Sequence, residues 1–197
     1  LLNNGAKHGM QIIDEKINVL YVEGMPRWEY RYLRWVLLRD PRLNVRFLMT
    51  QGDKYLAATS PRHLGAFPSE AEDMLSYDLV ILGDVSASFF SNEQVRWMEE
   101  LVKGRELGEE NNASALVGGG GSLLMLGGQV ASPATYFNSP IADLLPVRMD
   151  STSRQWYHGS SHPVVTPDGL ESSVVSLHPE KETNDRIWKM VSPMGYM

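Results

Sequence analysis

The chain has no cysteine, no excess of basic residues and no long apolar run, and each absence excludes a class of protein. Without a thiol, disulfides, thiolate metal sites and cysteine nucleophiles are excluded, although either redox compartment suits such a chain. A formal net charge of −6 argues against a nucleic-acid partner, which requires a basic face. No stretch approaches the roughly 20 apolar residues of a membrane-spanning helix, so we expect no membrane insertion by this chain.

Apolar segments that alternate with a helical pattern predict an α/β fold. Residues 17–22 and 43–49 have the composition of core strands, and residues 27–39 between them have helical spacing, with Pro26 at the first helical position. Residues 77–82 predict a third strand. Residues 122–126 lie between glycines and predict a fourth strand, buried on both faces in the middle of a parallel sheet. This order favours a three-layer sandwich with a mainly parallel, flavodoxin-like sheet.

The segments between these strands contain helix-start signals and two polar stretches. Capping boxes predict helices that start at Ser69, with Glu72, and at Ser91, with Gln94. Residues 51–68 are broken by glycine and proline and indicate a long loop. Residues 104–117 form a polar insertion that we expect to be exposed and poorly ordered, and residues 139–145 predict a short helix.

The two ends of the chain have weaker patterns. We expect residues 1–15 to be a tail or the end of an upstream domain, and residues 16–197 to form one domain that is truncated at its carboxyl end. Within the last fifty residues the pattern predicts strands at 154–158 and 163–166, a turn at 166–169 and a helix at 183–190.

Four segments together resemble one known family. They are VLYVEGMPRWEYRYLRWVLLRDPRLNV (19–45), YDLVILGDV (77–85), GGSLLMLGGQ (120–129) and SPIADLLPV (139–147). They resemble the class I glutamine amidotransferase-like domain of large bacterial membrane-anchored proteins, which often contain a von Willebrand factor A-like region. The resemblance implies a class I amidotransferase fold and a soluble fragment of a membrane-anchored bacterial parent, on either side of the membrane.

The resemblance also locates the position of the family's nucleophile. Active members have a cysteine at the elbow after a central strand, in a Cys-Leu-Gly-x-Gln pattern. In this chain the pattern falls on residues 125–129, so Met125 occupies the cysteine position and Gly127 and Gly128 complete a degenerate elbow. A thioether has no proton to lose and cannot form the thioester, so glutamine hydrolysis by that route is excluded. Gly83 matches the family's oxyanion-loop glycine.

A second short motif resembles the remaining catalytic groups of the family. His178-Pro179-Glu180 reproduces the His-Pro-Glu that supplies the base and its orienting carboxylate in active members. Because this motif follows Met125 too closely, we interpret His178 and Glu180 as parts of an ordinary loop.

The strand ends predict a ligand-binding crevice. Since the carboxyl ends of parallel strands meet at one edge of a sheet, the residues that follow them should lie together. These candidates are Arg27, Glu29, Gly83, Asp84, Gly127, Gly128 and Gln129. A helix amino terminus beside an arginine would suit an anion.

A structural interpretation of the same segment stays open. Trp28 and Trp35 would pack the helix on the sheet, while Arg27, Glu29 and Arg31 form ion pairs. A carboxylate cluster of Glu23, Glu29, Asp53 and Asp84 could in principle hold a hard cation, but no ligand spacing marks it, and we predict no metal and no cofactor.

These observations lead to two functional hypotheses. The first is a non-catalytic, amidotransferase-like module that binds another domain of its parent, a protein partner or a small anionic ligand. The alternative is a hydrolase or transferase that uses the same fold with non-cysteine residues, with Glu29, Asp84 or His178 as acid or base.

Overall fold

The computed structural model describes residues 16–52, 55–106, 116–117, 120–147, 160–191 and 194–195. The chain forms two compact units, Leu1–Arg148 and Met149–Met197, and each is described by itself. None of the helices in the described ranges combines the length and apolar character needed to cross a lipid bilayer.

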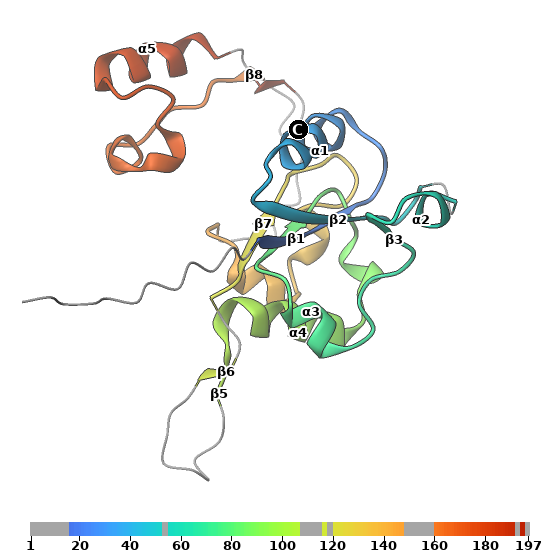
Figure 1. Cartoon of the computed structure of the whole chain (residues 1–197). Coiled ribbons are helices and arrows are strands. Elements are labelled where there is room, and N and C mark those ends of the chain that lie inside the picture. The colour runs from blue at the N-terminus through green and yellow to red at the C-terminus, as the bar shows by residue number, and fades with distance from the viewer. Residues whose placement is uncertain are drawn as a thin grey trace, which may run out of the picture. The chain divides into compact units, whose positions relative to one another are not determined.

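The first unit is built on a parallel sheet with helices on both faces (Figure 1). The sheet has the strand order β3-β2-β1-β4-β7, and all four pairings are parallel. Its strands are β1 (Ile17–Glu23), β2 (Leu43–Met49), β3 (His63–Leu64), β4 (Leu79–Leu82) and β7 (Ser122–Met125). One face is covered by α1 (Trp28–Arg39) and the other by α3 (Ala71–Leu75) and α4 (Asn92–Lys103) (Figure 1). The predicted three-layer, flavodoxin-like α/β fold is therefore confirmed.

Shorter elements complete the first unit. They are α2 (Leu56–Thr59), the 3-10 helices η1 (Ala87–Phe89), η3 (Ala134–Tyr136) and η4 (Pro140–Leu144), and an antiparallel pair, β5 (Arg105–Glu106) with β6 (Leu116–Val117). The helix predicted at residues 139–145 is thus a short 3-10 helix. Residues 107–115, the middle of the predicted polar insertion, lie outside the described residues.

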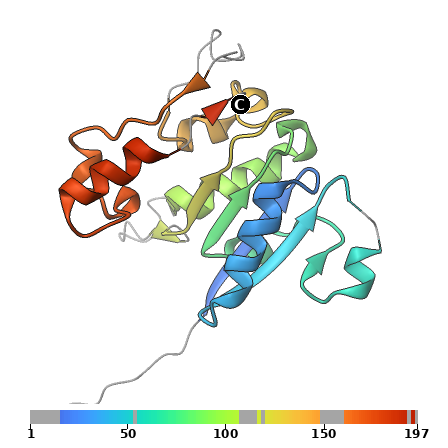
Figure 2. The same ribbon diagram turned by 90° about the horizontal axis from the view of Figure 1, so that it is seen from above.

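The hydrophobic core is centred on β1, which lies between β2 and β4 in the sheet. The side chains of Val19, Leu20, Tyr21 and Val22 are fully buried. Alternate residues of β1 and β2 pack with Tyr30 and Leu37 of α1 in one cluster. Figure 2 shows α1, in blue, in front of the strands of the sheet. Because side chains alternate between the faces of a strand, Leu20 and Val22 lie on the opposite face of the sheet.

The predicted position of residues 122–126 in the middle of the sheet is wrong. Among the described strands, β7 lies at the edge of the sheet and pairs only with β4. Its burial alternates, with Ser122 exposed and Leu124 43% exposed. A short apolar run between glycines cannot distinguish a central strand from an edge strand, because neighbours decide burial.

The structure also corrects the loop predicted at residues 51–68 and the predicted start of the first helix. The predicted loop at residues 51–68 contains α2 and β3, and His63 and Leu64 add a strand beside Phe47 and Leu48. Two residues are too few to show strand periodicity. Pro26 precedes the helix, because the extended residue Arg27 is the N-cap of α1.

The two predicted capping boxes have different outcomes. At α4, the Ser91 hydroxyl accepts from the Gln94 N–H at 3.2 Å, and the Gln94 amide oxygen accepts from the Ser91 N–H at 3.0 Å. At α3, Glu70 is the N-cap and makes no side-chain cap hydrogen bond, so the box predicted at Ser69 is wrong. The sequence signature is the same, but the α3 helix begins one residue later than the pattern requires.

The second unit contains one regular helix, α5 (Lys181–Met190), which extends the predicted 183–190 by two residues. An antiparallel pair, β8 (Ser160–Ser161) with β9 (Met194–Gly195), and two 3-10 helices, η5 (Gly169–Glu171) and η6 (Ser173–Val175), complete its described part. The predicted turn is confirmed by the Thr166 hydroxyl, which accepts from the Gly169 N–H. Residues 163–166 are not a strand, since no described strand pairs with them. The strand predicted at 154–158 lies outside the described residues.

The capping difference gives a matched pair of variants. Replacing Ser91 with alanine should lower the free energy of unfolding by about 1 kcal/mol, because an N–H of α4 loses its acceptor. Ser69→Ala should change it by no more than a few tenths of a kcal/mol, since its hydroxyl caps no helix. Urea denaturation of both variants measures the difference, and an equal loss in the two would contradict the helix starts described here.

Candidate functional site

The predicted crevice exists at the carboxyl edge of the sheet. The chain runs from β1 to β2 on one side and returns to β4 on the other, so the β1–β4 junction is the topological switch point where open α/β sheets place ligands. A pocket of about 300 Å³, called the crevice below, lies at this junction. It is lined by Met25, Pro26, Arg27, Trp28, Glu29, Gln51, Asp84, Gln129 and Val130. The structure thus brings together four of the predicted residues, Arg27, Glu29, Asp84 and Gln129.

Glu23, at the end of β1, is a fully buried carboxylate beneath the crevice. Its Oε1 accepts from the Gly24 N–H at 3.0 Å and from the Asp84 N–H at 2.8 Å. Its Oε2 accepts from the Tyr21 hydroxyl and the Arg27 Nε, each at 3.1 Å. From the sequence, Glu23 was considered only as a possible cation ligand. In the structure, its carboxylate accepts hydrogen bonds from protein groups, and these bonds join β1 to the loop after β4.

Arg27 connects this carboxylate to the loop after β7. Its Nη1 donates to the Gly127 carbonyl at 2.7 Å, and it forms an ion pair with Glu23 at 3.1 Å and a longer one with Glu29 at 4.0 Å. Its Nη2 is buried and has no hydrogen-bond partner among the described residues. Arg27 therefore has a structural role, and one of its donor groups has no acceptor in the described part of the chain.

The expected packing of the tryptophans of α1 is wrong. Trp28 and Trp35 are 66% and 55% exposed, and the buried residues of the helix are Tyr30 and Leu37. Arg31 forms no ion pair among the described residues, and its guanidinium instead lies 5.6 Å from the Trp28 ring centroid. Both faces of α1 are apolar, so spacing alone could not show which one meets the sheet.

Asp84 fixes the loop that follows β7. Its carboxylate accepts from the backbone N–H groups of Val130, Ala131 and Ser132 at 2.9, 2.7 and 2.9 Å. Burial raises the pKa of Asp84, but these hydrogen bonds outweigh burial and hold the pKa below its ordinary value. Asp84 is therefore ionised at neutral pH, and its oxygens are engaged by the protein.

The candidate oxyanion loop has no free donors at residues 83–85. The Gly83 N–H donates to the Val22 carbonyl at 2.8 Å, the Asp84 N–H to Glu23, and the Val85 N–H to the Gly83 carbonyl at 2.9 Å. A Cβ at Gly83 would lie 2.3 Å from the Glu23 Oε2. Position 83 therefore requires glycine, because any side chain there would collide with the buried Glu23 carboxylate.

Met125 is the last residue of β7 and pairs with Leu82 of β4. The following Leu126 N–H donates to the Leu82 carbonyl at 2.8 Å, which continues the ladder of the sheet. The next helical element is the short η3, which begins nine residues after Met125, at Ala134. A nucleophile elbow is a sharp strand-to-helix turn, whereas Met125 lies in extended backbone before a loop.

The His178 and Glu180 side chains make local contacts in the second unit. The His178 Nδ1 accepts from the Glu180 N–H at 3.1 Å, and the Glu180 carboxylate accepts from the Thr183 hydroxyl at 2.6 Å. In the described ranges, no three His, Asp or Glu side chains lie together as metal ligands. Asp53, one member of the considered carboxylate cluster, lies outside the described residues.

Comparison with known proteins identifies one family. A family model described as "Putative glutamine amidotransferase" matches residues 48–182, which is more than half of the chain. The matched segment runs from the end of β2 through β4 and β7 to the start of α5, so it contains the Asp84 and Gly127 loops. Neither the curated proteins nor the solved structures gave a match.

Two neighbouring glycines provide a test of the Asp84 contacts. A Cβ at Gly128 would lie 2.1 Å from the Asp84 Cγ, whereas a Cβ at Gly127 would meet no atom within 4 Å. Gly128→Ala should therefore lower the free energy of unfolding by about 1–3 kcal/mol, and Gly127→Ala should stay within about 0.5 kcal/mol. Thermal or urea denaturation compares the two variants, and equal stabilities would show that the loop is not held against Asp84.

Proposed function

Because the chain belongs to the glutamine amidotransferase-like family, we propose that it is a non-catalytic member that acts as a binding module of a larger membrane-anchored protein. The observation that carries this proposal is Met125 at the nucleophile position. Its thioether cannot be deprotonated and cannot form the acyl intermediate on which glutamine hydrolysis depends.

The groups around Met125 support the same conclusion. The N–H groups of residues 83–85, where an oxyanion would be bound, all donate to protein acceptors. Leu126, directly after Met125, donates its N–H to the sheet. An oxyanion hole requires donors aimed at the developing charge, and these donors have other acceptors.

The contacts of the acidic residues argue against the alternative of non-cysteine chemistry. A general acid or base must exchange a proton near neutral pH, but hydrogen bonds hold the pKa of Asp84 low and occupy both of its oxygens. The Glu29 side chain is 61% exposed and lies at the rim of the crevice, where it is open to water and not enclosed with a substrate. These residues suit recognition better than proton transfer.

The rim of the crevice favours a protein segment as its ligand. Met25, Trp28 and Val130 line it and are 49%, 66% and 67% exposed, although each is apolar. Exposed apolar side chains around a polar centre are typical of protein interaction sites. Such a segment, from another domain of the parent or from a separate partner, would cover these exposed apolar side chains.

The non-catalytic assignment is tested with glutamine itself. Ammonia release by the protein should equal that of the Met125→Ala variant and of buffer, because neither side chain can attack an amide. A coupled glutamate dehydrogenase assay measures the ammonia. Release by the unmodified chain above the Met125→Ala control would overturn the assignment.

The binding role is tested by site-specific photo-crosslinking. With the photoreactive amino acid p-benzoylphenylalanine at Val130, in the full-length parent in its native membrane, irradiation should give a discrete cross-linked product. The same label at Val164, which is 86% exposed and lies in the second unit, is the control. No product at Val130, or the same products from both positions, would contradict a partner seated on the crevice.

A further inference from the structure

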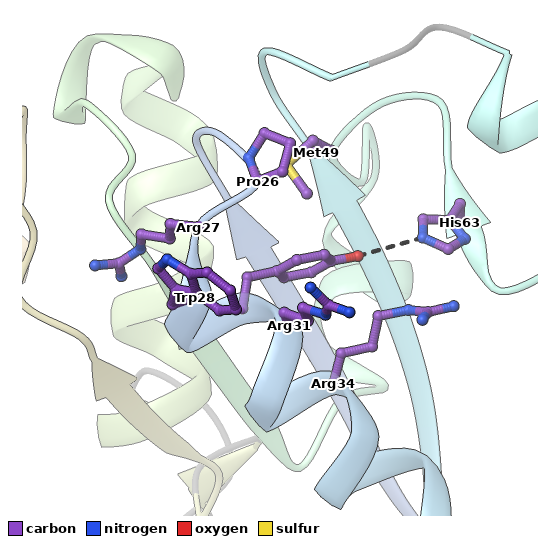
Figure 3. Close-up of a pocket in the computed structure, with 8 residues that line it drawn as sticks. Pro26, Arg27, Trp28, Arg31, Arg34, Met49 and His63 are labelled. Carbon is purple, nitrogen blue, oxygen red and sulfur yellow. Dashed lines mark hydrogen bonds between the residues drawn. The ribbon is translucent and has the colours of Figure 1, made fainter.

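A larger pocket lies on the other side of Arg27 and Trp28 from the crevice. It has a volume of about 540 Å³ and is lined by Pro26, Arg27, Trp28, Tyr30, Arg31, Arg34, Met49 and His63 (Figure 3). These residues come from α1 and the turn before it, from the end of β2 and from the start of β3. The volume is within the range of small-molecule sites. We call it the arginine pocket.

The lining of the arginine pocket is cationic. It includes three arginines and no carboxylate, in a chain whose net charge is −6. Arg27 is paired with Glu23, but no described carboxylate forms an ion pair with Arg31 or Arg34. The Arg31 and Arg34 guanidinium groups lie instead over aromatic rings, 5.6 Å from Trp28 and 5.7 Å from Phe47. Two positive charges in this pocket therefore have no partner of opposite charge.

Besides Arg27 Nη2, two buried polar atoms of the pocket lining have no hydrogen-bond partner in the described part of the chain. His63 is 9% exposed, and its Nδ1 has no hydrogen-bond partner among the described residues; the same holds for the buried Nε of Arg34. An unsatisfied buried polar group destabilises the fold, so a ligand that supplies acceptors would relieve this cost. These unpartnered atoms are a second indication of a ligand site, in addition to the positive charge of the lining.

The tautomer of His63 is assigned from its contact with Tyr30. Its Nε2 lies 3.4 Å from the Tyr30 hydroxyl, the dashed line in Figure 3. With the hydroxyl donating to Nε2, the proton of the neutral ring lies on Nδ1. Burial, and then the charge of Arg34, lower the pKa of His63, so the ring is uncharged at neutral pH.

We propose that the arginine pocket binds a phosphomonoester that carries an aromatic or other apolar group. Arg31 and Arg34 match the two negative charges of a phosphate dianion, and guanidinium groups bind its oxygens in pairs. In the assigned tautomer, His63 Nδ1 supplies a further donor. Trp28, Pro26 and Met49 form the apolar part of the lining and would contact the organic group. This site does not depend on the proposed role of the crevice.

Isothermal titration with phenyl phosphate tests the proposal, with inorganic phosphate and phenol as the two partial ligands. Phenyl phosphate should bind with a dissociation constant below about 1 mM and at least about fivefold more tightly than either partial ligand, because only it uses both parts of the pocket. No binding at about 10 mM, or equal affinity for inorganic phosphate, would overturn the proposal.

Variants on one helix assign the binding to the pocket. Arg31→Gln and Arg34→Gln should each weaken phenyl phosphate binding about tenfold, while Arg39→Gln, the same change in the last turn of α1, should alter it less than about twofold. Circular dichroism checks that each variant is folded. If Arg34→Gln unfolds, the exposed Arg31 still decides the question. Equal effects of Arg31→Gln and Arg39→Gln would place the anion elsewhere.

Discussion

The structure depends on one buried carboxylate, that of Glu23 at the end of the central strand. An ion removed from water costs several kcal/mol unless charge and hydrogen bonds compensate it. Here Arg27 supplies the charge, and the Tyr21 hydroxyl and the Gly24 and Asp84 N–H groups supply the remaining donors. Because these donors come from β1, from the turn after it and from the loop after β4, satisfying one carboxylate positions three segments at the ligand edge of the sheet.

Side-chain hydrogen bonds also hold the loop after β7. Arg27 reaches the Gly127 carbonyl, and Asp84 accepts from three successive N–H groups at residues 130–132. Polar groups that could act on a substrate are thus engaged in holding the backbone. This arrangement agrees with the proposed non-catalytic role, because carboxylates that hold the backbone are not available for chemistry. The side chains that stay exposed at the crevice include the apolar Met25, Trp28 and Val130.

Helix α1 contributes to both proposed sites. Its amino end, with Pro26, Arg27 and Trp28, lines the crevice on one side and the arginine pocket on the other. The two differ in chemistry, because the crevice contains Glu29 and Asp84 whereas the arginine pocket has no carboxylate in its lining. A macromolecular partner at the first proposed site and a small anion at the second would therefore both contact Trp28.

Local patterns in the residues were enough to predict the fold class, the bounds of β2 and the Ser91 cap of α4, because periodicity and capping are local signals. The strand-end rule also predicted that Arg27, Glu29, Asp84 and Gln129 lie together. The position of β7 at the edge of the sheet, the buried face of α1 and the hydrogen bonds of Asp84 and His63 followed from the folded chain and from no local pattern. These depend on partners distant in sequence: Arg27 meets a carbonyl 100 residues away, and Asp84 meets N–H groups 46 to 48 residues away. A local sequence pattern does not predict which distant donor will form a hydrogen bond with a buried acceptor.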